Sequence, residues 1–333
     1  MCGPALATIA LLSVSLPDER QPTLLTVAVH APTVTAHAPP CRLLSLSGGG
    51  SWGAWEAGVL QRLLDERGDA FDYARVLGVS AGSINAVFLA TEPPGNAGLC
   101  AGAARLHELW AGLRTSDVWR FKSLIDRSKS LLSTAPLRRT LERTLNGRNV
   151  ARNVTVGITS LATGEAVLVN EPEISRNNLV TLLLASSAIP VLFPPVSYNH
   201  SSSTSIYVDG GLVSNVLTVH GVERCLAGAP IEIDIINALP LLSPLAPAQV
   251  EKLGLVEIAL RSVQVLIQTA MTHQLNNFKC NPGQRSNVLA RVFAPRAGLG
   301  LVLPTLLDFD HGEWLWRAGY DQSAAPQEFF FCV

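Results

Sequence analysis

The sequence has few charged residues and no excess of basic ones. Only 15% of its 333 residues are charged, and 25 basic against 26 acidic side chains give a formal net charge of −1. Domains that bind nucleic acid carry basic patches or stripes, so we expect no nucleic acid partner. With 48% hydrophobic residues the chain can bury a large core, and we expect one large domain over residues 41–333.

Recognisable metal-binding patterns are also missing. The cysteines form no C-x-x-C pair and show no zinc-ligand spacing; they lie at positions 2, 41, 100, 225, 280 and 332. Each is most simply interpreted as a small buried hydrophobic residue, and any pairing between them stays open. We therefore expect neither a metal ion nor another cofactor.

No apolar run is long and uninterrupted enough to cross a membrane. Residues 179–196 contain Ser186, Ser187 and three prolines, and residues 262–278 contain glutamine, histidine and asparagine side chains. A transmembrane helix needs about 20 consecutive apolar residues. Contact with lipid is therefore expected to be peripheral.

The N-terminal residues 1–40 have two open interpretations. Residues 5–16 are apolar, as in a secretory signal, but no basic residue precedes them. The alternative is a disordered arm that continues through the proline-containing stretch 17–40. Two N-glycosylation patterns begin at Asn153 and Asn199, although Asn153 leads into an expected strand. Together these features favour a secretory location over a cytoplasmic one.

The stretch from Cys41 to Gly82 contains the clearest structural pattern. Two strand-like apolar runs, 43–46 and 76–79, each lead into a glycine-bearing turn and then into a helix-like pattern. The second turn reads Gly78-Val79-Ser80-Ala81-Gly82, the G-x-S-x-G arrangement that holds a serine on a sharp strand-to-helix turn. Ser80 is therefore the candidate nucleophile, and Gly78 and Gly82 leave room for the turn.

The first turn, Gly48-Gly49-Gly50-Ser51-Trp52-Gly53, has two competing roles. Backbone N–H groups at a helix start can hold a developing oxyanion, which makes Gly48, Gly49, Gly50 and Ser51 candidate donors, with Gly53 as support. The same glycines match the dinucleotide fingerprint, which also requires an acidic residue at the end of the next strand. Asp69 and Asp72 precede that strand and Ser80 follows it, so the oxyanion role is preferred.

A base is needed because a serine hydroxyl is a weak nucleophile until its proton is removed. Asp209 follows a short strand expected at 205–208, and Gly210 and Gly211 allow a tight turn directly after it. We expect Asp209 to deprotonate Ser80 directly. The alternative is a Ser-Asp-His triad, for which three histidines follow Asp209 in the chain: His220, His273 and His311.

The three motifs together resemble those of the patatin-like phospholipase family, which has a G-G-G-x-[RK]-G loop, a G-x-S-x-G elbow and a later D-G-[GA]. Order and spacing agree over residues 41–220, and the stretch from Ala185 to Pro195 is similar to the segment that precedes the family's aspartate. The resemblance implies a Ser80–Asp209 dyad, a glycine-loop oxyanion hole and hydrolysis of fatty-acyl esters of glycerolipids. A non-catalytic lipid-binding module on the same fold stays a further alternative.

Trp52 is a departure from that family pattern, because it occupies the position of the arginine or lysine. The fixed positive charge is therefore missing, and an oxyanion would rely on backbone amides. The indole ring has two interpretations: it lines an acyl or head-group slot, or it packs against Trp55 or the sheet edge.

The order of the expected elements favours an α/β fold. Strands alternate with helices, which is typical of a mostly parallel sheet covered by helices on both faces. The helix that begins at residue 53 carries Trp55 and Val59 on one face and Glu56 and Gln61 on the other. The remaining expected elements are helices at 134–147, 177–187, 248–276 and 309–320, strands at 231–236 and 287–293, and a hairpin of 154–159 with 166–169.

Residues 114–133 show no strong helical or strand periodicity and precede the helix expected at 134–147. Trp119, Phe121 and Leu124 lie there among basic residues. The segment is a candidate lid or substrate-facing insertion, and ordinary loop packing is the alternative.

Overall fold

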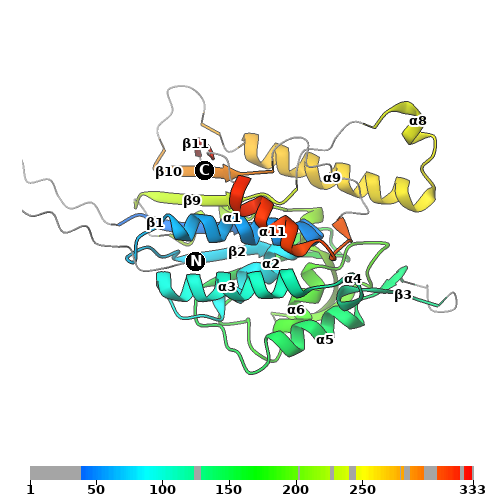
Figure 1. Ribbon diagram of the computed structural model, residues 1–333, viewed down its shortest axis with the longest axis horizontal. Coiled ribbons are helices and arrows are strands. Elements are labelled where there is room, and N and C mark those ends of the chain that lie inside the picture. The colour runs from blue at the N-terminus through cyan, green and yellow to red at the C-terminus, as the bar shows by residue number, and fades with distance from the viewer. Residues whose placement is uncertain are drawn as a thin grey trace, which may run out of the picture.

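The computed structural model describes residues 39–123, 129–201, 203–225, 229–239, 245–277, 279–280, 286–295, 306–322 and 326–331. The strands of the main sheet are β1 (Cys41–Leu46), β2 (Arg75–Val79), β5 (Val154–Ser160), β6 (Ala166–Asn170), β7 (Val196–His200), β8 (Ser203–Asp209), β9 (Ile231–Ile236), β10 (Val288–Phe293) and β11 (Gln327–Phe331). Their order is β11-β10-β9-β1-β2-β5-β8-β7, with β6 also paired to β5 (Figure 1). From β10 to β5 the strands run parallel, and antiparallel pairs form the two edges.

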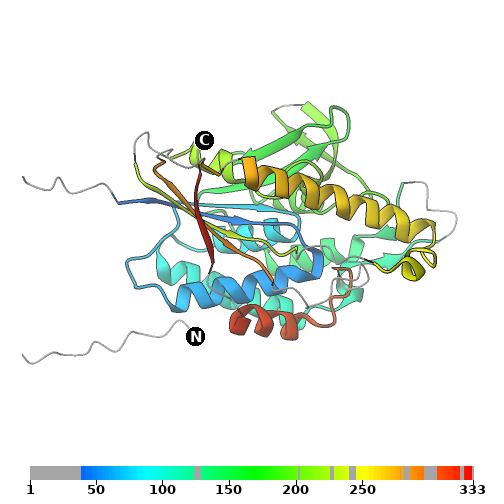
Figure 2. The same cartoon turned by 90° about the horizontal axis from the view of Figure 1, so that it is seen from above.

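Helices cover both faces of the sheet, which confirms the expected α/β architecture. They are α1 (Gly53–Asp65), α2 (Ala81–Ala90), α3 (Asn96–Gly112), α4 (Thr115–Val118), α5 (Ala135–Thr144), α6 (Leu179–Ser186), α7 (Thr218–Val222), α8 (Pro247–Val250), α9 (Leu255–Asn277) and α11 (Gly312–Gln322). In Figure 2, α9 lies on one side of the sheet, and α1 and α11 lie on the other. Across the described ranges, no helix has the length and apolar character needed to span a bilayer.

The core is divided between these two faces because successive side chains of a strand point in opposite directions. Leu44 of β1 belongs to the larger cluster, which includes side chains of α1, α2 and α3. Leu43, the preceding residue, belongs to the smaller cluster, which includes Met271 of α9. One strand at the centre of the sheet therefore contributes to both cores.

The expected elements are present with shifts at their ends. The hairpin of β5 with β6, the strand that ends at Asp209, and helices α5 and α6 all occur close to their expected positions. The helix expected at 248–276 is divided, because α8 ends at Val250 and α9 begins at Leu255, directly after Gly254. The sequence pattern indicates neither β7 nor β11, both of which lie at edges of the sheet.

Residues 114–133 form a small unit apart from the main sheet. After α4, strand β3 (Arg120–Phe121) pairs with strand β4 (Leu132–Ser133) in a separate two-stranded sheet. Leu124 and the rest of residues 124–128 lie outside the described residues. In Figure 1 this hairpin projects at the end of the molecule where α8 also lies.

The first helix is buried on more sides than its amphipathic pattern indicates. Both α11 and α3 pack against α1, and Glu56 and Gln61, expected on the outer face, are buried. That expectation is wrong because a periodic pattern identifies one apolar face but not the neighbours that cover the other. Glu56 Oε2 accepts a hydrogen bond from Asn85 Nδ2 at 2.8 Å, and Trp110 Nε1 donates to Asn85 Oδ1 at 2.8 Å.

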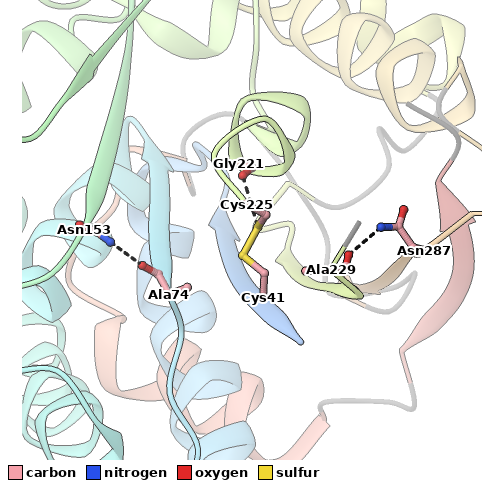
Figure 3. The surroundings of a disulfide bond; sticks show 7 residues. All are labelled: Cys41, Ala74, Asn153, Gly221, Cys225, Ala229 and Asn287. Carbon is pink, nitrogen blue, oxygen red and sulfur yellow. Dashed lines mark hydrogen bonds between the residues drawn. A yellow bond between two sulfur atoms is a disulfide. The ribbon is translucent and has the colours of Figure 1, made fainter. Parts of the chain in front are cut away.

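A disulfide closes the end of the sheet that is remote from Ser80. Cys41, at the start of β1, is bonded to Cys225, which follows α7, across a sequence separation of 184 residues (Figure 3). Cys100 and Cys280 are disulfide-bonded as well. The interpretation of each cysteine as a buried hydrophobic residue is therefore wrong for these four. A bond that closes so long a loop restricts the unfolded chain and so stabilises the folded one.

Replacing Glu56 with glutamine should change how stability depends on pH. Burial raises the pKa of Glu56 well above the ordinary carboxyl value, and the hydrogen bond from Asn85 offsets only part of this increase. Because the folded state then holds this proton to a higher pH than the unfolded chain does, the unfolding free energy falls as pH rises between the two pKa values.

Glu56→Gln cannot ionise and should remove that part of the decrease. Denaturant unfolding of both proteins from about pH 5 to about pH 9 measures the effect. Parallel stability curves across this range would contradict the assignment of a buried, protonated Glu56.

Candidate active site

The pairing of β5 places Ser80 and Asp209 next to each other. β6 pairs along one edge of β5, so β2 and β8 must share the other edge. β2 pairs there as far as Val79, opposite Gly157, and β8 ends there with Asp209 opposite Ile158. The two strands therefore meet end to end, and Ser80 follows Val79 at the junction.

Ser80 has the strained backbone of a sharp strand-to-helix turn. Its φ of 52° and ψ of −124° lie outside the regions that residues other than glycine usually adopt. Ser80 N donates to Ser186 Oγ at 2.9 Å, and Ser186 Oγ donates to Gly157 O at 2.7 Å. The Ser186 hydroxyl thus ties the turn to β5. Gly78 and Gly82 lie in close contact beneath it, since a methyl group on Gly78 would be 2.2 Å from Gly82 O.

Asp209 ends β8 and is only 4% exposed. Its Oδ1 atom accepts a hydrogen bond from Gly211 N at 2.8 Å, within the turn that Gly210 and Gly211 form. Burial raises the pKa of Asp209 to about 6, while the Ser80 hydroxyl and the Gly211 N–H stabilise the charged form and limit the increase. The carboxylate can therefore exchange a proton close to neutral pH.

The glycine loop reaches the same point from β1. A methyl group on Gly48 would lie 2.9 Å from Ser80 Cβ. Gly48 N donates to Asn215 Oδ1 at 3.0 Å, and Asn215 Nδ2 donates to Gly48 O at 3.4 Å, so this amide is already engaged. In the part of the chain that the structure describes, the N–H groups of Gly49 and Gly50 donate to no acceptor.

Gly50, Ser51 and Gly53 lie further along the loop. Gly50 has a φ of 57°, and a methyl group on it would be 2.2 Å from Leu306 O, so its conformation and its space both require glycine. Ser51 is buried. Gly53 begins α1 against the ring of Trp110, where a methyl group would be 2.5 Å from Cζ2.

Ser80 faces an apolar cavity, of which about 70 Å³ is open to a water-sized molecule. Gly48, Gly49, Gly50 and Asp209 also line it, so the structure brings the main site candidates together. The rest of the lining is mostly apolar: Ile189, Leu192, Leu239, Val263, Ile267, Leu306 and Leu307, with Asn215 and Gln264. An adjoining cavity of about 40 Å³ shares Gly50, Ser80, Ile189 and Leu307 with the first.

Other groups that could supply chemistry lie elsewhere. His220, His273 and His311 are exposed, and none of them lines either cavity at Ser80. A larger cavity of about 320 Å³, lined by residues of α3 and α5, contains none of the predicted site residues. Within the described ranges, no group of three or more His, Cys, Asp or Glu side chains gathers where it could hold a metal ion.

Trp52 does not line a substrate slot. Its side chain is 1% exposed and packs in the larger core cluster, which also contains Trp55. It is not among the residues that line the two cavities at Ser80. The interpretation of Trp52 as part of an acyl or head-group slot is therefore wrong, and the packing alternative describes it.

Sequence reasoning missed three contributors to the site. Asn215 holds the Gly48 backbone, Ser186 holds the Ser80 backbone, and Leu307 belongs to a distant segment that lines both cavities. Ser186 lies in the stretch that resembles the family's pre-aspartate segment. A serine whose hydroxyl bonds only backbone groups, however, leaves no recognisable sequence motif. Asn215 follows the D-G-G turn closely, which is the one local signal that was available.

The family of the chain follows from comparison with known proteins. The sequence profile described as patatin-like phospholipase matches residues 44–220, more than half of the chain. The chain belongs to the patatin-like phospholipase family. A protein of Escherichia coli (strain TW11681) described as a cGAMP-activated phospholipase is 29% identical over 203 residues, covering 53% of this chain and 53% of that protein. The patatin-like chain thus spans about half the length of this relative.

A solved structure also resembles the patatin-like chain. VipD from Legionella pneumophila matches with a TM-score of 0.38 and 14% sequence identity, over 88% of this chain and 69% of that chain.

Gly50→Ala should destabilise this patatin-like protein more than Gly147→Ala does. Both glycines have positive φ, 57° and 72°, so each alanine costs about 1–2 kcal/mol of backbone strain. Only at Gly50 does the new methyl group also meet a carbonyl oxygen, because nothing lies within 4 Å of the corresponding position at Gly147. Denaturant unfolding of both variants measures the difference. Equal losses of unfolding free energy would mean that the Leu306 backbone can move away from the new methyl group without loss of stability.

Proposed function

We propose that this chain is a serine-dependent lipid acyl hydrolase with Ser80 as nucleophile and Asp209 as base. The observation that carries the proposal is the meeting of β2 and β8 on one edge of β5. It brings a hydroxyl and a carboxyl group to the same apolar cavity. Membership of the patatin-like phospholipase family supports ester hydrolysis on lipids as the reaction class.

Asp209 acts as general base in both halves of the reaction. Ser80 Oγ attacks the acyl carbonyl carbon while its proton passes to Asp209, and the carbonyl electron pair moves onto the oxygen. The tetrahedral intermediate expels the alcohol, which takes the proton from Asp209 and leaves an acyl-enzyme. Water then attacks the acyl group as Asp209 accepts its proton. The fatty acid leaves, and the proton returns to Ser80 Oγ.

Among the candidate oxyanion donors, the N–H groups of Gly49 and Gly50 fit the role best. Both residues line the cavity with Ser80, whereas Gly48 N is bonded to Asn215, and the buried Ser51 is not among the lining residues. Fixed amides of this kind stabilise developing charge without reorganising during the reaction. Asn215 is then a positioning residue, which holds the loop at the distance that the oxyanion requires.

The cavity supports a fatty-acyl ester as the substrate. Its lining is mostly aliphatic, and apolar pockets with a few placed polar groups are typical ligand sites. The open volume of about 70 Å³ is too small for a long acyl chain, so binding of such a chain requires side chains of the lining, such as Leu306 and Leu307, to move. Glycerolipid esters remain our expectation for the substrate class.

Three alternatives remain, and a specific observation weighs against each. A Ser-Asp-His triad requires a histidine at the cavity, and the described histidines of the C-terminal half lie away from it. A non-catalytic lipid-binding module would have no need for a strained serine beside a buried carboxylate with a raised pKa. The dinucleotide alternative lacks its acidic partner, because Ser80 follows the second strand.

We also propose a secretory route for the protein. Disulfides persist mainly in oxidising compartments, and Cys41, Cys225, Cys100 and Cys280 are all bonded. Asn199 is exposed on β7 and is the better glycosylation candidate. Asn153 is also exposed, but its Nδ2 atom donates to Ala74 O at 3.0 Å (Figure 3).

Ser80→Ala and Asp209→Asn should each lower hydrolysis of a soluble p-nitrophenyl ester by roughly three orders of magnitude or more, because the two residues act as one unit. Both proteins should fold, since each substitution is close to isosteric. His220→Ala, His273→Ala and His311→Ala are the matched controls and should retain most of the activity. An inactive histidine variant together with an active Asp209→Asn enzyme would establish the triad instead.

The rate should depend on the ionisation of Asp209. Its pKa of about 6 means that the carboxyl group is protonated, and unable to accept the Ser80 proton, at lower pH. We expect kcat/KM to reach a plateau above about pH 7 and to fall tenfold per pH unit well below about pH 6. A pH–rate profile on the soluble ester measures this, and a flat profile through that region would refute Asp209 as the base.

A further inference from the structure

A short hairpin beside the cavity presents an aromatic side chain to solvent. In the sheet of β3 and β4, Phe121 pairs opposite Leu132. Leu132 is buried, whereas Phe121 is 71% exposed. Single apolar residues are common on protein surfaces, so the surroundings of Phe121 decide whether it has a role.

Those surroundings are basic. Arg120 and Lys129 are exposed and Lys122 is half-buried. None of these three cations forms an ion pair with another residue that the structure describes. Unpaired cations around the exposed Phe121 ring match the two layers of an anionic bilayer surface, its phosphates and its acyl region.

Phe121 is connected to the wall of the active-site cavity through Trp119. The two rings meet edge to face, with centroids 5.3 Å apart. Trp119 Nε1 donates to Leu307 O at 3.0 Å, and Leu307 lines both cavities at Ser80. The exposed Phe121 ring therefore packs against Trp119, which is hydrogen-bonded to the cavity wall at Leu307.

The second strand of the hairpin is joined to another part of the same wall. Leu131 N donates to Val191 O and Leu132 N donates to Leu192 O, both at 2.9 Å. Leu192 lines the cavity. Val191 is exposed and has a φ of 71°, which a β-branched residue rarely adopts. Whatever binds the hairpin is thus held beside the wall of the Ser80 cavity.

We propose that the described residues 120–122 and Lys129 of the β3–β4 hairpin dock this protein on a membrane, with an anionic phospholipid bilayer as the partner. Phe121 enters the acyl region, and Arg120, Lys122 and Lys129 contact lipid phosphates. α8 lies toward the same end of the molecule in both views (Figures 1 and 2). The proposal rests on the proposed function, because docking beside Ser80 delivers a lipid substrate to the nucleophile.

Vesicle binding by the Ser80→Ala protein tests the proposal without catalysis. We expect this protein to sediment with mixed vesicles of phosphatidylcholine and phosphatidylserine, and to bind vesicles of phosphatidylcholine alone more weakly. The difference in binding between the two kinds of vesicle should decrease at high salt. Phe121→Ala should weaken binding to both vesicles about tenfold. The triple variant Arg120→Ala, Lys122→Ala and Lys129→Ala should weaken binding to the anionic vesicles about a hundredfold at low salt.

Matched controls remove the same groups from other parts of the surface. Phe330→Ala replaces another phenylalanine, which is 54% exposed on β11, and the triple variant Arg139→Ala, Arg176→Ala and Arg224→Ala removes three exposed cations. Both controls should bind vesicles as the parent does. With Ser80 intact, the hairpin variants should hydrolyse a soluble short-chain ester at the wild-type rate and lose activity only on vesicles.

Vesicle binding that is unchanged in both hairpin variants, or equally weakened in the controls, would overturn the proposal. The proposal would also be overturned if the protein formed a dimer that Phe121→Ala dissociates while vesicle binding persists. The surface around Phe121 would then bind a second copy of the chain. Hairpin-dependent binding by a protein that has no esterase activity would support docking and overturn the proposed function, so the two failures are distinguishable.

Discussion

The site depends on two strands that share one edge of β5. Since β6 occupies the opposite edge, β2 and β8 can pair only by following one another, and their ends must meet. The backbone hydrogen bonds of β2 and β8 with β5 therefore set the separation of Ser80 and Asp209, which does not depend on a flexible loop. A slip of one residue in either strand would turn its side chains to the other face of the sheet. The geometry of the pair is thus as well determined as the sheet itself.

Burial gives the site two properties at once. The apolar surroundings that suit an acyl chain also disfavour the charged form of Asp209, which raises its pKa to about 6. A carboxylate destabilised in this way is a stronger base than one in water. Hydrogen bonds from the Gly211 N–H and the Ser80 hydroxyl limit this increase in the pKa of Asp209. Under the proposed mechanism, a more polar cavity would therefore weaken both acyl-chain binding and the basicity of Asp209.

The sequence was informative where a function needs a local backbone shape. The turns at Gly48–Gly53, Gly78–Gly82 and Asp209–Gly211 could be predicted because tight turns of this kind require glycine and serine at fixed spacing. Asn215, Ser186 and Leu307 could not, because each acts through a contact with a residue far away in the chain. Glu56 was misplaced for the related reason that α3 covers a face which the helical period alone assigns to solvent.

The bond between Cys41 and Cys225 encloses the glycine loop, the Ser80 turn and Asp209 in one covalent ring. A protease that cuts this ring once, for example at the exposed Arg120, leaves two peptides that remain a single molecule. Because β2, before the cut, and β8, after it, both pair with β5, we expect the arrangement of Ser80 and Asp209 to survive the cut. A nicked chain would separate into fragments on a reducing gel while retaining its native arrangement in solution.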